Sequence, residues 1–483
     1  MLRGTLGGRS GGPVRKAIPP CPGAHLWTRK SAILLALKLA FKDARMLEST
    51  HPLSPKMSRA LLMFAVPIFL SHSVSAGVAR AADWPGWRGS GRDGIVEGFR
   101  APGEWPSALK ELWKVPVGEG HASPIGIGGQ TGVTFVFTRE KDEEVLRALS
   151  VLKGDLLWRT AYPAPYKVNP EAASHGPGPK STPLHSKGRV FTLGISGILT
   201  AFDVKTGAEA QPDAKPGTIA WQLSFEKEFP STSPLFGTAM SPVAEGDAVI
   251  AHVGGHDKGA LRAFDASTGE TLWSFAEDGP SYASPVVAEL GGERQWVSQT
   301  QTRLVGVSLK DGKLLWSVPF TTEYEQNSVT PLISKDLVIY SGYMLPVTAL
   351  RIGRDGAKWS TTEAWTNPEA SQYMSSPVLD AGRIYGMSMK QKGQIFALDG
   401  STGKTLWKGK GRLGESASVL SLGSVLMVLT TEGELSFLKP GDKADEILAK
   451  YNVGASPTWA TPAVVEGRIL VKDKTTLWCY GMK

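Results

Sequence analysis

The sequence predicts an all-β fold, an eight-bladed β-propeller of four-stranded antiparallel blades. Three observations predict it: a repeated strand-turn-strand motif, a second landmark that occurs eight times, and no sustained helical periodicity after the N-terminal leader. A repeat period in the forties with about four short strands per unit is typical of propeller blades.

The clearest copy of the motif is residues 261–273, Leu-Arg-Ala-Phe-Asp-Ala-Ser-Thr-Gly-Glu-Thr-Leu-Trp. Asp265 can hydrogen-bond its own backbone at the turn, and Gly269 accepts the positive φ that such a turn needs. Segments of equal length that also end on Trp are 146–158, 304–316, 347–359 and 395–407. An interrupted copy starts at Leu199, and we expect Trp221 to replace its missing Trp.

The second landmark is a small residue or two before Pro, followed by an apolar strand. It occurs at 122–124, 181–183, 240–242, 283–285, 329–331, 375–377 and 460–462, and residues 417–419 fill an eighth place without proline. The intervals are 59, 59, 43, 46, 46, 42 and 43 residues. Each landmark is expected to open the first strand of a blade.

Residues 376–407 show the four strands of one unit, at 378–379, 383–387, 394–398 and 405–407. The two longest units have extra residues at 162–180 and 211–236, which we expect as loops between one blade's last hairpin and the next first strand.

The last unit ends at Cys479 and Tyr480, after its third strand, while a strand at 110–117 has no hairpin partner. Pairing these two ends would supply the missing fourth strand and leave no open sheet edge. The sequence therefore predicts a ring closed by its N-terminal strand.

Four segments follow from this pattern. Residues 1–56 are an overextended start or a disordered basic leader, and residues 57–82 have the charged, apolar and cleavage regions of a signal peptide. Residues 83–109 form a Trp-rich lead-in packed on the propeller, which occupies residues 110–481.

Charge and cysteine content limit the partners. Residues 1–82 carry 12 Lys and Arg against 2 Asp and Glu, whereas the rest carries 41 against 43, which makes nucleic acid an unlikely partner. The mature chain would keep only Cys479, so we expect no internal disulfide and no lipid-bearing cysteine. The apolar run of the signal segment is too short for a stable membrane anchor. We expect a monomer in the periplasm or outside the cell.

The pattern Ala-x-Asp-x-x-Thr-Gly-x-x-Leu-Trp at 263–273 and 397–407 resembles the pyrroloquinoline-quinone-like (PQQ-like) propeller repeat. Quinoprotein alcohol dehydrogenases and the BamB-type outer-membrane assembly factor share this repeat, and the resemblance implies that its Trp packs blade against blade. It also implies an exported bacterial protein, because the Trp84-Pro-Gly-Trp-Arg-Gly segment looks like the lead-in of many exported members.

The chain departs from both relatives at their functional residues. It lacks the adjacent cysteine pair and the haem-attachment motif of quinoproteins, and it lacks the lipid-bearing cysteine of the BamB-type factor. The nearest candidate for calcium, which takes oxygen ligands, is Glu325-Gln326-Asn327. PQQ with calcium would therefore be a cofactor only if the protein is a quinoprotein dehydrogenase.

The residues three positions before each landmark proline, or before its substitute Val419, should form a ring at the channel mouth. These residues are His121, Lys180, Ala239, Tyr282, Ser328, Met374, Ser416 and Trp459. Tyr282 and Trp459 could stack on a flat ligand, while His121 and Lys180 could bind an anion or act as acid and base. The alternative is that this ring only fills and solvates the mouth.

Two further segments contain histidines. Residues 175–181, His-Gly-Pro-Gly-Pro-Lys-Ser, lack the Gly-Lys of a phosphate loop and are better explained as a rigid channel-lining loop. His252 and His256 stand on a strand and its turn, where this spacing does not favour a shared metal. The candidate binding residues are His121, His175, Lys180, Tyr282, Asn327 and Trp459, and no metal ligands are assigned.

These observations favour a binding or assembly module that uses its channel-mouth face, with an envelope protein or a small molecule as partner. The sequence leaves enzymatic activity open and favours a binding role over it. The alternative is a PQQ- and calcium-dependent alcohol or sugar dehydrogenase, with Trp459 or Tyr282 against the quinone.

Overall fold

The computed structural model describes residues 83–129, 132–204, 215–443 and 446–482, and the predicted leader and signal peptide lie outside these ranges. Within them, no helix is long and apolar enough to cross a membrane.

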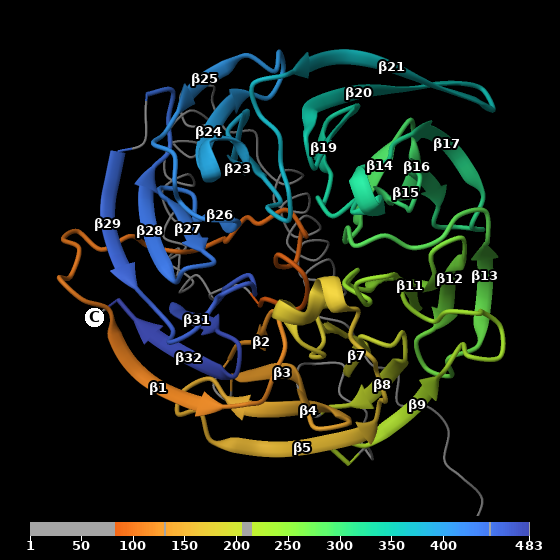
Figure 1. Cartoon of the computed structure of the whole chain (residues 1–483), viewed down its shortest axis with the longest axis horizontal. Coiled ribbons are helices and arrows are strands. Elements are labelled where there is room, and N and C mark those ends of the chain that lie inside the picture. The colour runs from red at the N-terminus through yellow and green to blue at the C-terminus, as the bar shows by residue number, and fades with distance from the viewer. Residues whose placement is uncertain (1–82, 130–131, 205–214, 444–445, 483) are drawn as a thin grey trace, which may run out of the picture. The chain divides into compact units, whose positions relative to one another are not determined.

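Eight four-stranded antiparallel sheets follow one another around a ring (Figure 1). The first blade consists of β2 (Ile125–Ile127), β3 (Val133–Glu140), β4 (Glu143–Ser150) and β5 (Leu156–Pro163), and the second of β6 (Leu184–Ser186), β7 (Arg189–Leu193), β8 (Leu199–Asp203) and β9 (Ile219–Leu223). The third blade consists of β10 (Val243–Glu245), β11 (Ala248–Gly255), β12 (Lys258–Asp265) and β13 (Thr271–Phe275), and the fourth of β14 (Val286–Leu290), β15 (Glu293–Gln299), β16 (Arg303–Ser308) and β17 (Leu314–Pro319).

The fifth blade consists of β18 (Leu332–Ser334), β19 (Leu337–Gly342), β20 (Leu345–Asp355) and β21 (Lys358–Asn367), and the sixth of β22 (Val378–Asp380), β23 (Arg383–Ser388), β24 (Gln394–Asp399) and β25 (Thr405–Lys408). The seventh blade consists of β26 (Ala417–Ser421), β27 (Leu426–Thr430), β28 (Glu434–Lys439) and β29 (Glu446–Asn452), and the eighth of β30 (Ala463–Val465), β31 (Arg468–Lys472), β32 (Thr476–Gly481) and β1 (Lys110–Pro116). Three short 3₁₀ helices lie in the connections: η1 (Pro170–His175), η2 (Glu323–Glu325) and η3 (Lys390–Lys392).

The N-terminal strand closes the ring, which confirms the prediction. β1 pairs antiparallel with β32, with Trp113 opposite Cys479 and Lys110 opposite Gly481. Figure 1 shows the orange β1 beside the blue β32. The eighth blade is thus shared between the two ends of the described chain.

The repeated Trp docks on the repeated Gly of the next blade. A Cβ built on Gly269 would lie 2.9 Å from Trp221, and one on Gly312 would lie 2.5 Å from Trp273. Both glycines also have positive φ, 79° and 72°. The turn conformation and the close approach of the indole therefore both require Gly at this position of the repeat.

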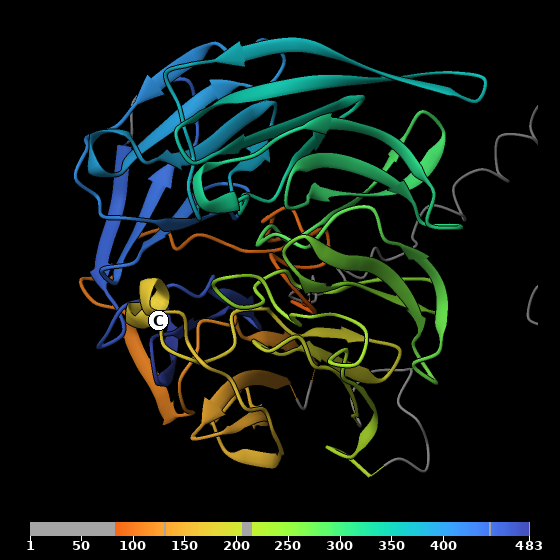
Figure 2. The same ribbon diagram turned by 45° about the vertical axis from the view of Figure 1, so that its right-hand side comes forward.

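The fifth blade corrects the predicted repeat at 347–359. Trp365, not Trp359, stands opposite Ala349, the position that a repeat Trp takes in the other blades. The prediction was wrong because the β20–β21 hairpin is longer than its counterparts and projects beyond them (Figure 2). Trp359 lies near the hairpin tip, where the Arg354 guanidinium is 4.9 Å from its ring centroid.

The long second unit needs a smaller correction. Trp221 pairs with Ala201, as expected for the interrupted copy. However, β9 (Ile219–Leu223) lies inside the segment 211–236 that we expected to be a connecting loop. Part of the insertion therefore belongs to the β8–β9 hairpin, because the fourth strand forms only at the displaced Trp.

The residue before each landmark proline, or before Val419, is Ser or Thr in all eight blades. Around much of the ring, the backbone N–H at this position donates to the hydroxyl at the same position of the next blade. These bonds are Ser123 to Thr182 (3.4 Å), Thr182 to Ser241 (3.0 Å), Ser241 to Ser284 (3.0 Å), Thr330 to Ser376 (3.0 Å) and Thr461 to Ser123 (2.9 Å). We call these eight residues the hydroxyl belt.

The lead-in fills the channel at the level of the hydroxyl belt, where Figure 1 shows it as the orange segment in the middle of the ring. Arg92 is buried, and its guanidinium donates to the carbonyls of Pro285 (2.7 Å), Pro242 (2.9 Å) and Ser241 (3.1 Å). Burial lowers the pKa of Arg92 to about 9. This single side chain therefore joins the third and fourth blades.

Other lead-in residues reach further blades. Arg88 donates to the carbonyls of Ser376 (2.9 Å) and Pro377 (2.6 Å) in the sixth blade. The Trp87 indole N–H donates to the Thr330 hydroxyl (2.9 Å) in the fifth, and Trp84 bridges to Gly126 in the first. The lead-in thus acts as a hub for the first strands.

Replacing Ser241 by Ala should lower the free energy of unfolding by about 1–3 kcal/mol, because the buried Thr182 N–H loses its acceptor. Urea titration would measure the change. Ser267→Ala, in an exposed turn, is the matched control and should be nearly neutral. Equal stability of the two variants would contradict a structural role for the hydroxyl belt.

Replacing Arg92 by Met should cost more, at least roughly 3 kcal/mol, because three carbonyls of the third and fourth blades lose a charged donor. The exposed Arg100 of the same lead-in supplies the control Arg100→Met. Thermal unfolding should show a clearly lower midpoint for the first variant only. Identical midpoints would mean that the lead-in does not hold the ring.

Candidate functional site

A cavity of about 540 Å³ lies at the channel mouth. Seven of the eight ring residues line it: His121, Lys180, Ala239, Tyr282, Ser328, Met374 and Trp459. The eighth, Ser416, is buried and exchanges a hydrogen bond with the Ser375 hydroxyl at 2.8 Å. Trp87 also lines the cavity, so the lead-in forms part of the cavity wall.

One side of the cavity is an aromatic corner of His121, His175 and Trp459. The ring centroids of His175 and Trp459 are 4.8 Å apart, and those of His121 and Trp459 are 6.4 Å apart. His121 Nε2 lies 3.0 Å from the His175 carbonyl oxygen, to which it donates. Burial, with the nearby His175 and Lys472, lowers the pKa of His121 to about 3, so this imidazole is neutral at pH 7.

The short helix η1 brings His175 to this corner. The Asn169 side chain caps η1 by accepting the Glu171 N–H at 2.9 Å. Glu171 and Ala172 of the same helix also line the cavity. The predicted loop 162–180 therefore starts only after β5 ends at Pro163, and it lines the cavity with its own helical turn. Burial lowers the pKa of His175.

Phe236 organises another part of the cavity wall. Its carbonyl accepts a hydrogen bond from Lys180 Nζ at 2.7 Å, and its N–H donates to the Tyr282 hydroxyl at 3.2 Å. Burial lowers the pKa of Lys180 to about 8 and raises the pKa of Tyr282. The amine and the phenol are thus both fixed by one backbone unit.

Lys472, which sequence reasoning missed, binds the backbone next to His121. Its fully buried Nζ donates to the carbonyls of Asp473 (2.7 Å), Lys474 (3.0 Å), Gly120 (3.1 Å) and Gly118 (3.2 Å). Burial lowers its pKa to about 7. Only its position directly after the apolar run Ile469-Leu470-Val471 of β31 could have signalled this role.

Glu144, also missed, supports the Phe236 side. Its buried carboxylate accepts the Ile195 N–H at 2.7 Å and the Tyr162 hydroxyl at 2.8 Å. The Ile195 carbonyl in turn accepts the Thr238 N–H at 3.0 Å, two residues from Phe236. Burial raises the pKa of Glu144 to about 7.

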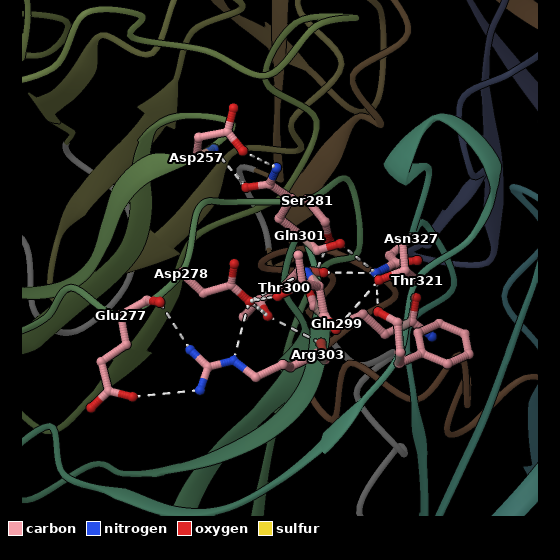
Figure 3. A network of polar contacts seen from close by, with 12 residues as sticks. Asp257, Glu277, Asp278, Ser281, Gln299, Thr300, Gln301, Arg303, Thr321 and Asn327 are labelled. Atoms are coloured by element: carbon pink, nitrogen blue, oxygen red, sulfur yellow. Dashed lines mark hydrogen bonds and ion pairs between the residues drawn. The ribbon is translucent and has the colours of Figure 1, made fainter.

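Asn327 does not join the cavity. Its buried amide nitrogen lies within 3.0 Å of the Thr300, Gln301 and Phe320 carbonyls, and its side-chain oxygen accepts the Thr322 N–H at 3.0 Å (Figure 3). Its backbone carbonyl accepts the N–H groups of Tyr282 and Ala283. Asn327 therefore positions Tyr282 instead of facing a ligand.

Glu325, His252 and His256 also have polar partners in this region. Gln301 Nε2 donates to Glu325 (2.8 Å), and His256 Nδ1 lies 3.2 Å from the same carboxylate oxygen. His252 Nε2 lies 2.9 Å from the Asp278 carbonyl. In the described ranges, no group of three or more His, Cys, Asp or Glu is placed to hold a metal.

Glu144 predicts a pH dependence of stability. Because its folded-state pKa lies above the usual 4.5, the folded chain keeps a proton that the unfolded chain releases, and stability falls as pH rises from about 4.5 to about 7. Glu144→Gln removes this loss, so the variant should gain roughly 3 kcal/mol relative to wild type between pH 4 and pH 8.

Urea titrations at pH 4 and pH 8 measure this gain. The exposed Glu270 supplies the control Glu270→Gln, which should track wild type at both pH values. A constant difference between Glu144→Gln and wild type would contradict the raised pKa.

Comparisons with known proteins agree with this architecture. The family model described as "Outer membrane protein assembly factor BamB" matches residues 142–409. The BamB of Yersinia pestis is 23% identical over 390 residues, which cover 76% of this chain and 86% of that protein. The BamB of Shewanella oneidensis is 21% identical over 344 residues, 68% of this chain and 77% of that protein.

Two solved structures show the same fold. The BamB of Moraxella catarrhalis aligns with a TM-score of 0.54 and 14% identity, over 77% of this chain and 98% of that one. The quinohemoprotein alcohol dehydrogenase of Comamonas testosteroni aligns with a TM-score of 0.58 and 15% identity, over 84% and 81%. Because the family model covers more than half of its length, this chain belongs to the family of the outer membrane protein assembly factor BamB.

Proposed function

We propose that this protein is an exported protein-binding module that takes part in assembly in the cell envelope through its channel-mouth face. Export would use the signal peptide at 57–82, and the mature chain would act as a monomer in the periplasm or outside the cell. The observation that carries the proposal is the concentration of non-repeated aromatic and cationic side chains around the channel-mouth cavity.

The lining of this cavity suits binding. Trp459 and Tyr282 combine a large apolar surface with one polar group each, the combination that favours aromatic residues at interfaces. His121 is neutral at pH 7 and Lys180 is held by a carbonyl, so both present fixed hydrogen-bonding groups. The family relatives named as assembly factors support a protein partner in the envelope.

The second candidate is a quinoprotein oxidoreductase, favoured by the flat aromatic faces of Trp459 and Tyr282. The cavity would admit a flat ring, and Lys180 could face an acidic substituent of it. The expected calcium ligands do not fit, because Glu325 and Asn327 are bonded to neighbouring side chains and backbone. We therefore place this function second.

Affinity capture from envelope extracts tests the first function. The tagged full chain should recover a defined partner, and Trp459→Ala combined with Lys180→Met should reduce recovery by at least about tenfold, as for central interface residues. Leu157→Ala, at a side chain 51% exposed on β5, is the control and should recover the same partner. Undiminished capture by the double variant would contradict a role for the channel mouth.

The alternative has its own readout. The purified full chain can be titrated with the quinone and Ca²⁺ and then assayed with an artificial electron acceptor and alcohols or sugars. Turnover that Trp459→Ala abolishes would establish the oxidoreductase and overturn the binding function.

A further inference from the structure

A second cavity, of about 600 Å³, lies beside the channel-mouth cavity on the loops of the fifth, sixth and seventh blades. We call it the tyrosine hollow, because Tyr324, Tyr343 and Tyr373 line it. Tyr324 and Tyr373 also line the channel-mouth cavity, so the two cavities adjoin. Neither the repeat nor the ring of channel-mouth residues predicts this hollow.

Its apolar part consists of the three tyrosines and Met389. The Tyr343 and Tyr373 rings meet edge to face with centroids 5.0 Å apart, and the Tyr373 hydroxyl donates to the Gln326 side chain. Tyr324 is 66% exposed, and Met344, whose N–H lies 3.5 Å from Met389 Sδ, is 70% exposed. A soluble protein that leaves such large apolar side chains together at one place commonly uses them as an interaction site.

The charged side chains at the rim of the tyrosine hollow form no ion pairs among the described residues. The exposed side chains of Lys392 and Arg412 form no hydrogen bond or ion pair there, and neither do those of Glu323 and Glu415. Exposed charges around an apolar centre give the hollow the arrangement of a protein interface, whose rim is polar. Both signs of charge are open to an incoming molecule.

The backbone of the hollow is strained at three residues. Tyr324, Lys392 and Arg412 have φ of 56°, 60° and 70°, a region that residues other than Gly adopt only at a cost. Hydrogen bonds between the loops hold this conformation, because Arg412 N–H donates to the Gln391 carbonyl (2.9 Å) and Gly414 N–H to the Lys392 carbonyl (3.2 Å). Strain of this kind concentrates at binding sites that the surrounding fold fixes in advance.

We propose that the tyrosine hollow docks an extended peptide segment of a partner protein, which inserts one large apolar side chain between the three tyrosines. An acidic residue of the segment pairs with Lys392 and Arg412, and a basic residue faces Glu323. The inference rests on the proposed function, since it assigns the protein partner of the channel-mouth face a specific contact.

A peptide segment fits better than a small molecule. Tyr and Met are enriched at the centres of protein interfaces, and the centre of the hollow contains both. Methionines such as Met389 and Met344 are flexible enough to pack around different apolar side chains. The charges of both signs then select the residues that flank the anchor.

Panning random linear peptides displayed on phage against the immobilised full chain tests this inference. Enriched peptides should share a large apolar residue with an acidic neighbour. A synthetic copy of one should bind the full chain in fluorescence anisotropy, and Arg412→Glu or Tyr343→Ala should each weaken it by about tenfold or more. Both residues line the tyrosine hollow and not the channel-mouth cavity.

Trp459→Ala, in the channel-mouth cavity, and Leu157→Ala, on β5, are the controls and should bind the peptide as wild type does. The inference is overturned if no common peptide is enriched, or if Arg412→Glu and Tyr343→Ala leave binding unchanged. Capture of an envelope partner that needs Trp459 but tolerates Arg412→Glu would sink the inference and leave the proposed function standing. If the peptide panning and the envelope capture both fail, the inference and the proposed function are both wrong.

Discussion

Hydrogen bonds between the residues that lead into the first strands of neighbouring blades are the interaction on which the rest of this structure depends. The hydroxyl belt passes bonds from blade to blade, and the lead-in adds Arg88 and Arg92 where buried carbonyls need donors. Buried backbone groups without partners are costly, so this ring of small side chains stabilises the closed channel. The outer strands are then joined by Trp on Gly contacts such as Trp221 on Gly269.

This arrangement separates structure from function along each repeat. The Asp, Gly and Trp of a repeat make the turn and the contact with the next blade. The hydroxyl before the landmark proline joins neighbouring blades where their first strands begin. Positions three before the landmark proline make neither the turn nor the Trp contact, although Ser416 bonds Ser375 of the neighbouring blade. These positions vary from His to Met around the mouth. The mouth can therefore change its chemistry without loss of the ring, which is why a shared propeller fold does not fix function.

Periodicity made most of the fold predictable, because eight landmarks and the unpaired strand β1 determine the blade number and the closure. The same register placed seven ring residues at one cavity. Sequence reasoning failed where the role of a side chain depends on its tertiary contacts. The Asn327 side chain was expected as a ligand but bonds internally, and Lys472 and Glu144 support the site from other blades. Trp359 was misassigned because hairpin length cannot be derived from the repeat alone.

Hydrogen exchange of the full chain tests most directly the claim that the hydroxyl belt and lead-in form a rigid ring below an accessible binding face. The amides of Thr182, Ser241, Thr330 and Thr461 should exchange only by global unfolding, since each is buried and bonded to the next blade. Amides on the tyrosine hollow, such as those of Tyr324 and Lys392, should exchange by local opening and far faster. Equal exchange rates in the two groups would contradict the account.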